Sequence, residues 1–171
     1  MWLAIALCAL AAIAGRVTAA DGFVSGSHIV SGIDGYRHVT WRWQRVMGRR
    51  LTPSHRLERR TRDAAYRRIV LEFWRRHAHH ARRHAHHPPH LYAWRCIHRY
   101  EGSWTDPNAP YYGGLQMDLA FQRRYGRRLL RRKGTADHWS ALEQMWVAER
   151  AFRSGRGFNP WPNTARYCGL L

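Results

Sequence analysis

The sequence predicts a mostly helical α+β protein: a small C-terminal domain with a short β element, preceded by a basic N-terminal region that is partly helical or disordered. Three observations predict this architecture. Apolar residues recur at helical spacing on both sides of a loop-rich segment in the C-terminal half. A glycine pair within that segment favours a tight turn or short hairpin. The double proline Pro88-Pro89 marks a boundary, so we place the C-terminal domain at residues 91–171.

The chain begins with an apolar run, WLAIALCALAAIA, which is followed by Gly15, Arg16 and the small-residue stretch VTAADG. A run of this length is too short to span easily a hydrocarbon core of about 30 Å. Small residues after such a run are typical of a signal-peptide cleavage site. We therefore predict a signal peptide over residues 1–20, a secreted protein, and no stable membrane anchor after cleavage. An uncleaved anchor is the alternative.

The next segment, residues 21–56, carries Gly, Ser and His and then TWRWQRVMGRRL. We expect a basic leader without a fold of its own, although its alternating tryptophan and arginine also suit an anionic surface. Residues 57–76 are expected to form a helix, because apolar side chains line one side at spacings of four. These side chains are Ala65, Ile69 and Phe73, with Tyr66, Val70 and Trp74 beside them.

A histidine-rich run, HAHHARRHAHHPPH, occupies residues 77–90. Continued as a helix, it would place His77, His80, His84 and His87 on one stripe, and neutral imidazoles at such spacing can bind zinc, copper or nickel. The run supplies neither a carboxylate partner nor a fixed geometry. We therefore interpret residues 57–90 as a basic helix and a low-complexity linker, and we predict no metal site and no cofactor.

The C-terminal domain begins with a helix, LYAWRCIHRYE, whose Trp94, Ile97, His98 and Glu101 share one face. Gly102 ends this helix, and SWTDPNAPYYGG follows as a loop. Asp118 is expected to cap a short helix, LAFQRRY. The longest helix is predicted over about residues 139–153, and FNPWPNTARYCGLL closes the chain without a further long helix.

The cysteines support export. Removal of the signal peptide removes Cys8 and leaves Cys96 and Cys168, an even pair in an oxidising compartment. A bridge between them would stabilise this small domain by about 4 kcal/mol. Two buried free thiols are the alternative.

The formal net charge of +18 first suggests a nucleic-acid partner. Lys133 is the only lysine among the 29 basic residues, and Ala, Gly, His and Trp are abundant. This bias indicates GC-rich coding more than selection for phosphate contacts. We expect no nucleic acid as partner, and an affinity for anionic wall polymers instead.

Glu101 is an unusual carboxylate in this basic chain, because aromatic residues and glycines surround it. By itself it would be interpreted as a helix end on the surface. A glycosidase, however, needs a carboxylic acid that donates a proton to the leaving-group oxygen. Flat faces for sugar rings are available from Trp104, Tyr111, Tyr112 and Trp161, and Gly113 and Gly114 would let a polymer pass close to the backbone.

Motifs in a fixed order strengthen this interpretation. They are Glu101-Gly102 with Trp104, Tyr112-Gly113-Gly114-Leu115-Gln116, Val147-Ala148-Glu149, Trp161-Pro162 and Cys168-Gly169. In this order and at these spacings, residues 91–169 resemble the transglycosylase-like domain of resuscitation-promoting factors, in the lysozyme superfamily. The block from Tyr112 to Gln116, at its distance from the glutamate, is the most specific part.

The resemblance implies a small lysozyme-like domain that binds peptidoglycan glycan strands and cuts the bond between N-acetylmuramic acid and N-acetylglucosamine. It implies that Glu101 is the catalytic acid, that Tyr112 and Gln116 belong to the cleft and that Glu149 is structural. The family usually has cysteine directly before the glutamate, where this chain has Tyr100, and a longer serine-glycine-glycine run after it. Since Cys96 lies one helical turn earlier, a bridge to Cys168 would have shifted geometry.

Two reaction mechanisms, hydrolysis and lytic transglycosylation, remain open. Hydrolysis with two carboxylates needs a partner for Glu101, either Asp106 or Asp118, and both suit turn or capping roles better. A lytic transglycosylase needs one carboxylate, because the C6 hydroxyl of muramic acid attacks, and the sequence favours this route. The competing functional class is a non-catalytic, cationic protein that binds cell walls or acts as an antimicrobial.

Overall fold

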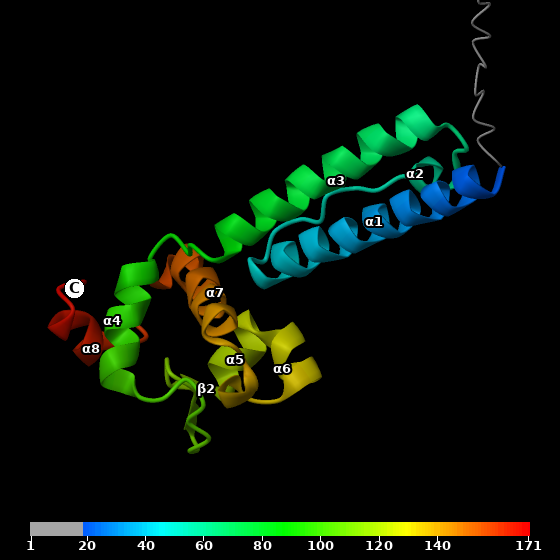
Figure 1. The fold of residues 1–171 in the computed structure, drawn as a ribbon. Helices are drawn as coiled ribbons and strands as arrows, with labels where there is room; N and C mark the ends of the chain where they lie inside the picture. The colour runs from blue at the N-terminus through cyan, green and yellow to red at the C-terminus, as the bar shows by residue number, and fades with distance from the viewer. Residues whose placement is uncertain (1–18) are drawn as a thin grey trace, which may run out of the picture.

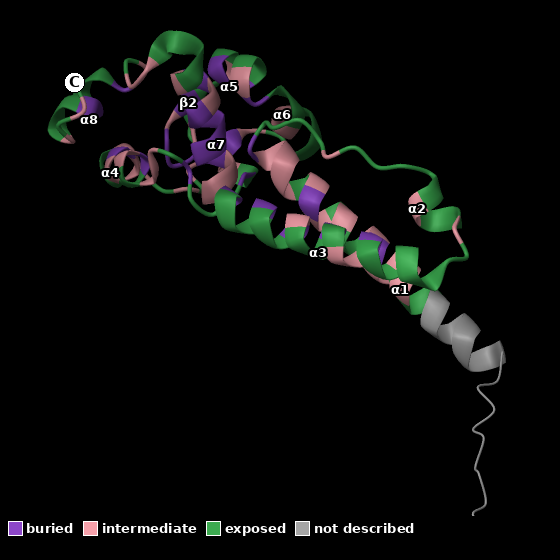
Figure 2. Cartoon of the chain, turned by 90° about the horizontal axis from the view of Figure 1, so that it is seen from above, coloured by how far each residue is buried: buried purple, intermediate pink, exposed green. Residues whose placement is uncertain are grey.

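The computed structural model describes residues 19–171, with side chains described from residue 27 onward. The predicted signal peptide therefore lies outside the described residues, apart from Ala19 and Ala20. Two long helices, α1 (Ala19–Val46) and α3 (Ala64–Ala85), lie side by side and run in the same direction (Figure 1). A connector that contains the short helix α2 (Leu57–Arg60) returns along one side of the pair (Figures 1 and 2).

The expectation that residues 21–56 have no fold is wrong for α1. Its Ile33 and Thr40 are fully buried, and Ile33 packs with Val70 and Trp74 of α3. The connector is fastened to the pair as well, because the Trp41 indole donates to the Thr52 carbonyl at 2.8 Å. The leader is helical because its apolar positions have a second helix to cover them, which composition alone does not reveal.

The interpretation of the histidine run as a linker is also wrong, since α3 continues to Ala85. Ala78, Ala81 and Ala85 extend the buried face begun by Val70 and Trp74, at alternating spacings of three and four. The buried face differs in part from the predicted apolar face, because the predicted residues Ile69 and Phe73 are 67 % and 36 % exposed. Small alanines, rather than large apolar residues, let the two helices approach.

The C-terminal half contains the remaining elements. They are α4 (Leu91–Glu101), β1 (Tyr111–Tyr112), β2 (Met117–Asp118), α5 (Leu119–Tyr125), α6 (Arg127–Lys133), a 3₁₀ turn (Ala136–His138), α7 (Ala141–Ala151), a π-helical turn (Phe152–Arg156) and α8 (Pro162–Tyr167). The two strands form an antiparallel pair, with Tyr111 opposite Asp118 and Tyr112 opposite Met117. The prediction of a mostly helical α+β protein with a short β element is confirmed.

Helix α7 is the centre of this half, and most of its residues are buried (Figure 2). Ser140 and Glu143 form a capping box, so the helix begins at Ala141 rather than at Trp139. Around α7 lie the core residues of α4, the strands and the C-terminal segment, including Trp94, Leu115 and Trp161.

The opposite side of α7 receives the ends of α1 and α3. Trp146 packs against Met47, Ala81 and Ala85, and its indole donates to the Ala85 carbonyl at 2.8 Å. Arg150 adds a hydrogen bond to the Val46 carbonyl at 2.9 Å. The N-terminal helices are therefore fastened to the C-terminal half. Within the part of the chain described, no helix is long and apolar enough to cross a membrane.

Candidate active site

Glu101 is the last residue of α4, and its side chain is half-buried. Gly102 follows with φ 148°, a left-handed backbone that favours glycine and turns the chain away from the helix. The hydroxyl of Thr164, on α8, donates to Glu101 Oε1 at 2.7 Å. Thr164 is itself buried, so α8 fixes the orientation of the carboxyl group at the end of α4.

A disulfide between Cys96 and Cys168 holds these two helices together, with a Cα–Cα distance of 6.0 Å. The predicted bridge is therefore present, one helical turn before Tyr100. The ring of Tyr100 contacts the ring of Tyr167, with centroids 5.9 Å apart. Since Thr164 lies one turn before Cys168, the bridge fixes the hydrogen bond between Thr164 and Glu101 across the helix pair.

Gln116 lies on the other side of Gly102. Its Nε2 donates to Asp106 Oδ2 at 2.8 Å and to the Gly113 carbonyl at 3.0 Å. A Cβ placed on Gly102 would lie 3.4 Å from this Nε2, so the amide is adjacent to the residue after Glu101. Gln116 and Asp106 therefore lie beside Gly102, the residue after Glu101, while Thr164 contacts the carboxyl group itself.

The remaining predicted substrate-binding residues are placed differently. Tyr111 is exposed and Tyr112 packs partly on the core. Trp161 is only 4 % exposed, and its indole donates to the Leu115 carbonyl, so it offers no open face to a sugar. Gly113 and Gly114 are buried as well, and the expectation that they leave room for a polymer is not met.

The two glycines are needed for packing inside the protein. A Cβ on Gly114 would lie 2.6 Å from His98 Nδ1 and 2.7 Å from the Trp104 ring. His98 and Trp104 are stacked there, with centroids 3.9 Å apart. A Cβ on Gly113 would lie 2.5 Å from Gln144 Oε1.

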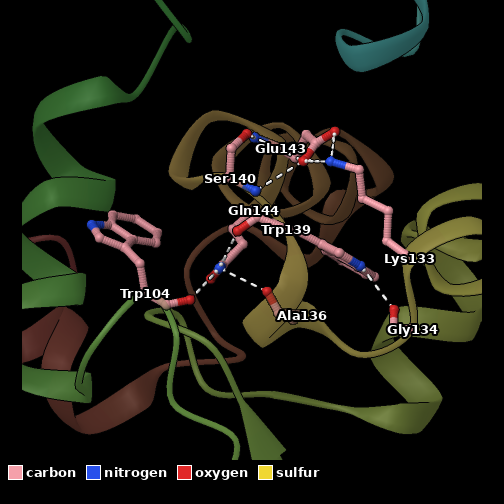
Figure 3. A network of polar contacts seen from close by, with 8 residues as sticks. All are labelled: Trp104, Lys133, Gly134, Ala136, Trp139, Ser140, Glu143 and Gln144. Carbon is pink, nitrogen blue, oxygen red and sulfur yellow. Dashed lines mark hydrogen bonds and ion pairs between the residues drawn. The ribbon is translucent and has the colours of Figure 1, made fainter.

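Gln144 is a residue that sequence reasoning missed. It is fully buried on α7, and its Nε2 donates to the carbonyls of Trp104 and Ala136 at 2.7 and 2.8 Å (Figure 3). It thereby ties the loop after Glu101 to the central helix. The sequence could have indicated this role, because a glutamine stands on the apolar surface of the predicted helix. A polar side chain buried there requires hydrogen-bond partners.

Glu149, expected to be structural, is fully buried in the same helix. Its Oε1 accepts hydrogen bonds from the His90 backbone N–H and from the Trp94 indole, both at 2.8 Å. The carboxylate therefore joins the start of α4 to α7 and contributes to the position of Glu101 at the other end of α4.

A cavity of about 370 Å³ borders Gln116, and Tyr111, Arg124 and Trp161 are also among its lining residues. Glu101 is not among them. Tyr125 also lines the cavity. A hydrogen bond with Ser154 lowers the pKa of its phenol, and Arg124 and Arg156 lower it further.

No protein-family model, no curated protein and no solved structure matches the chain. The resemblance to the transglycosylase-like domain therefore depends on the motifs in the sequence, and the geometry above is interpreted on its own terms.

The other two candidate carboxylates have local partners. Asp118 Oδ1 caps α5 by accepting from the Phe121 N–H at 2.6 Å, as predicted. Asp106 Oδ1 accepts from the Asn108 backbone N–H at 3.1 Å, which closes a turn, while Oδ2 accepts from Gln116. Glu101 is the carboxyl group of the three that is oriented by a residue from another helix.

The histidines of α3 lie far from this site along the chain. His80 Nε2 and His84 Nε2 are 3.1 Å apart. Within the described residues, no group of three or more His, Cys, Asp or Glu side chains is arranged to hold a metal ion.

Proposed function

We propose that the chain is a secreted peptidoglycan-cleaving enzyme with a lysozyme-like C-terminal domain, in which Glu101 is the general acid. The single observation that carries this proposal is the placement of Glu101. Its Oε1 accepts from Thr164 at 2.7 Å, and Gln116 stands beside Gly102. A carboxyl group that is half-buried and oriented by a hydrogen bond suits proton donation to a bound ligand. The order of the sequence motifs supports a glycan strand as that ligand.

The proposed reaction is lytic transglycosylation at the bond between N-acetylmuramic acid and N-acetylglucosamine. Glu101 protonates the glycosidic oxygen, and the bond from that oxygen to the muramic acid C1 breaks. The carboxylate then accepts the proton of the muramic acid C6 hydroxyl while its oxygen bonds to C1, so the acid is regenerated and no water is consumed. Because Asp106 and Asp118 already accept local hydrogen bonds, a mechanism with one carboxylate is favoured.

The test compares the parent chain with Glu101→Gln on purified cell walls. Loss of the acid should lower the rate of wall cleavage by about 10²–10⁴-fold. Glu72→Gln is the matched control, because it makes the same change on the exposed surface of α3 and should leave the rate unchanged. A Glu101→Gln protein that cleaves walls like the parent would refute the proposal.

Mass spectrometry of the released fragments tests the reaction type. Transglycosylation gives 1,6-anhydromuramic ends, whereas hydrolysis gives reducing ends that are heavier by one water molecule. Predominance of the heavier product would assign hydrolysis and require a second group to activate water.

The second candidate is a non-catalytic, cationic wall-binding or antimicrobial protein. The formal net charge of +18 favours it, since attraction to anionic polymers would not depend on Glu101. Wall binding that survives Glu101→Gln, with no soluble glycan released by the parent, would support this candidate.

A further inference from the structure

A second cavity, of about 590 Å³, lies at the junction of α1, the α5–α6 turn and α7. Eight arginine and lysine side chains line it, together with a single carboxylate, Glu143. This carboxylate is already occupied, because Lys133 Nζ donates to both of its oxygens at 2.7 and 2.8 Å. The seven arginines have no further carboxylate among the lining residues, so the cavity has a large excess of positive charge.

The arginines come from four helices, α1, α5, α6 and α7, and converge on one space. Arg45 lies on α1, Arg128 and Arg132 on α6, and Arg150 on α7. The Arg150 side chain is held in place at the edge of the cavity, because its Nε and Nη1 donate to the carbonyls of Tyr125 and Val46. The docking of α1 brings Arg45 next to arginines that lie about 80 or more positions later in the chain. Charges that only keep a surface solvated would not need such an arrangement.

Arg45 has an unusual environment in this cluster. Its Nε–H is buried and has no hydrogen-bond acceptor within the described chain. A buried donor without an acceptor is costly, so the positive charge of Arg45 is poorly compensated where this residue borders the cavity. Arg128 is also poorly compensated. Its pKa is lowered first by desolvation and then by the positive charges of Arg45, Arg132 and Arg131.

The pKa of Arg150 is lowered to about 10, first by burial and then by Arg153. In each case the protonated guanidinium is destabilised and still charged at neutral pH. A bound anion would remove this penalty, so ligand binding and protein stability should be coupled.

We propose that this cavity binds a compact, multiply charged phosphate anion of about di- or triphosphate size. Arginine is suited to this chemistry because its planar guanidinium binds phosphate oxygens through two parallel hydrogen bonds. The ligand is compact because the arginines surround one cavity between four helices rather than line an extended track. The proposal is independent of wall cleavage, since neither Glu101 nor Gln116 lines this cavity.

The experiment is isothermal titration calorimetry of the full chain with sodium tripolyphosphate at about 0.15 M ionic strength, where long-range attraction is screened. We expect saturable binding with one ligand per chain. The double variant Arg128→Gln/Arg132→Gln should lose affinity by about tenfold or more, since charge-assisted hydrogen bonds are removed. Both side chains are on the surface of α6, which has no buried residues, and thermal unfolding will verify that the variant is folded.

The matched control is Arg82→Gln/Arg166→Gln, which removes the same charge at exposed positions of α3 and α8. It should change the affinity by less than twofold, and Glu101→Gln should leave it unaltered. Equal losses in the two double variants, or binding without saturation, would overturn the proposal by showing general attraction to polyanions.

Other anions test the chemical assignment. Citrate that binds as tightly as tripolyphosphate would overturn the preference for phosphate. A single-stranded oligonucleotide or poly(glycerol phosphate) that binds more tightly, and loses affinity in the Arg128/Arg132 variant, would reassign the cavity to a polymer and overturn the compact ligand. Tripolyphosphate should also raise the unfolding temperature of the parent more than that of the variant.

Discussion

Removal of the Cys96–Cys168 disulfide should cost about 4 kcal/mol of unfolding free energy. The two cysteines are separated by 72 residues, and closing a loop of that length removes about 15 cal/mol/K of entropy from the unfolded chain by the chain-entropy relation, or about 4.4 kcal/mol at 25 °C. A domain of this size has a total stability of about 5–15 kcal/mol. The bridge is therefore expected to supply a large share of it.

The assay is urea denaturation of the parent and of Cys96→Ala/Cys168→Ala, followed by circular dichroism. We expect a lower midpoint and a higher m-value, because the unfolded chain without the bridge exposes more surface. The parent treated with a reductant should resemble the variant, which separates the bridge from the packing of the two side chains. A loss below about 1 kcal/mol, or two free thiols found by mass spectrometry of the unreduced parent, would refute the reasoning.

Three substitutions test other parts of the structure by chemical denaturation. Gly113→Ala should cost about 2–4 kcal/mol, because φ is +71° and the new Cβ would lie 2.5 Å from Gln144; a neutral result would contradict the close approach. Trp146→Ala should cost about 3–5 kcal/mol and make α1 and α3 susceptible to limited proteolysis, whereas unchanged cleavage would argue against docking. Glu149→Gln should cost about 1.5–3 kcal/mol by weakening the hydrogen bonds from His90 and Trp94. An unchanged free energy of unfolding would show that the carboxylate does not hold α4 against α7.

The helices around the site could be predicted from the sequence because each has a local signal. Trp94, Ile97 and Glu101 repeat at helical spacing, and Asp118 is a strong cap. The long helix α3 was only half predicted. Its buried face consists of alanines placed among histidines and arginines, so hydrophobicity is low there although the spacing is regular. Contact with Met47 and Trp146, rather than local propensity, buries Ala81, whereas Ile69 is exposed.

The candidate site was predicted at Glu101 and Gln116 but not in its supporting contacts. The cysteine pair was predicted because two cysteines remain once the signal peptide is removed, and their bridge brings Thr164 to Glu101. The hydrogen bond from Thr164 itself had no signal, because 63 residues separate the two side chains. Trp161 was assigned to substrate by its residue type, yet its burial is set by Trp94 and Phe121, which contact it from two helices.

The same helix connects the N-terminal helices to the candidate site. On α7, Trp146 and Arg150 contact α1 and α3, Glu149 fixes the start of α4, and Gln144 holds the loop after Glu101. A fragment that begins at residue 91 would expose the indole of Trp146 and leave its N–H without the Ala85 carbonyl. Because one rigid helix carries all four side chains, loss of the N-terminal helices would destabilise the support of the loop beside Glu101. The ends of α1 and α3 that contact α7 are therefore part of the framework that supports this loop.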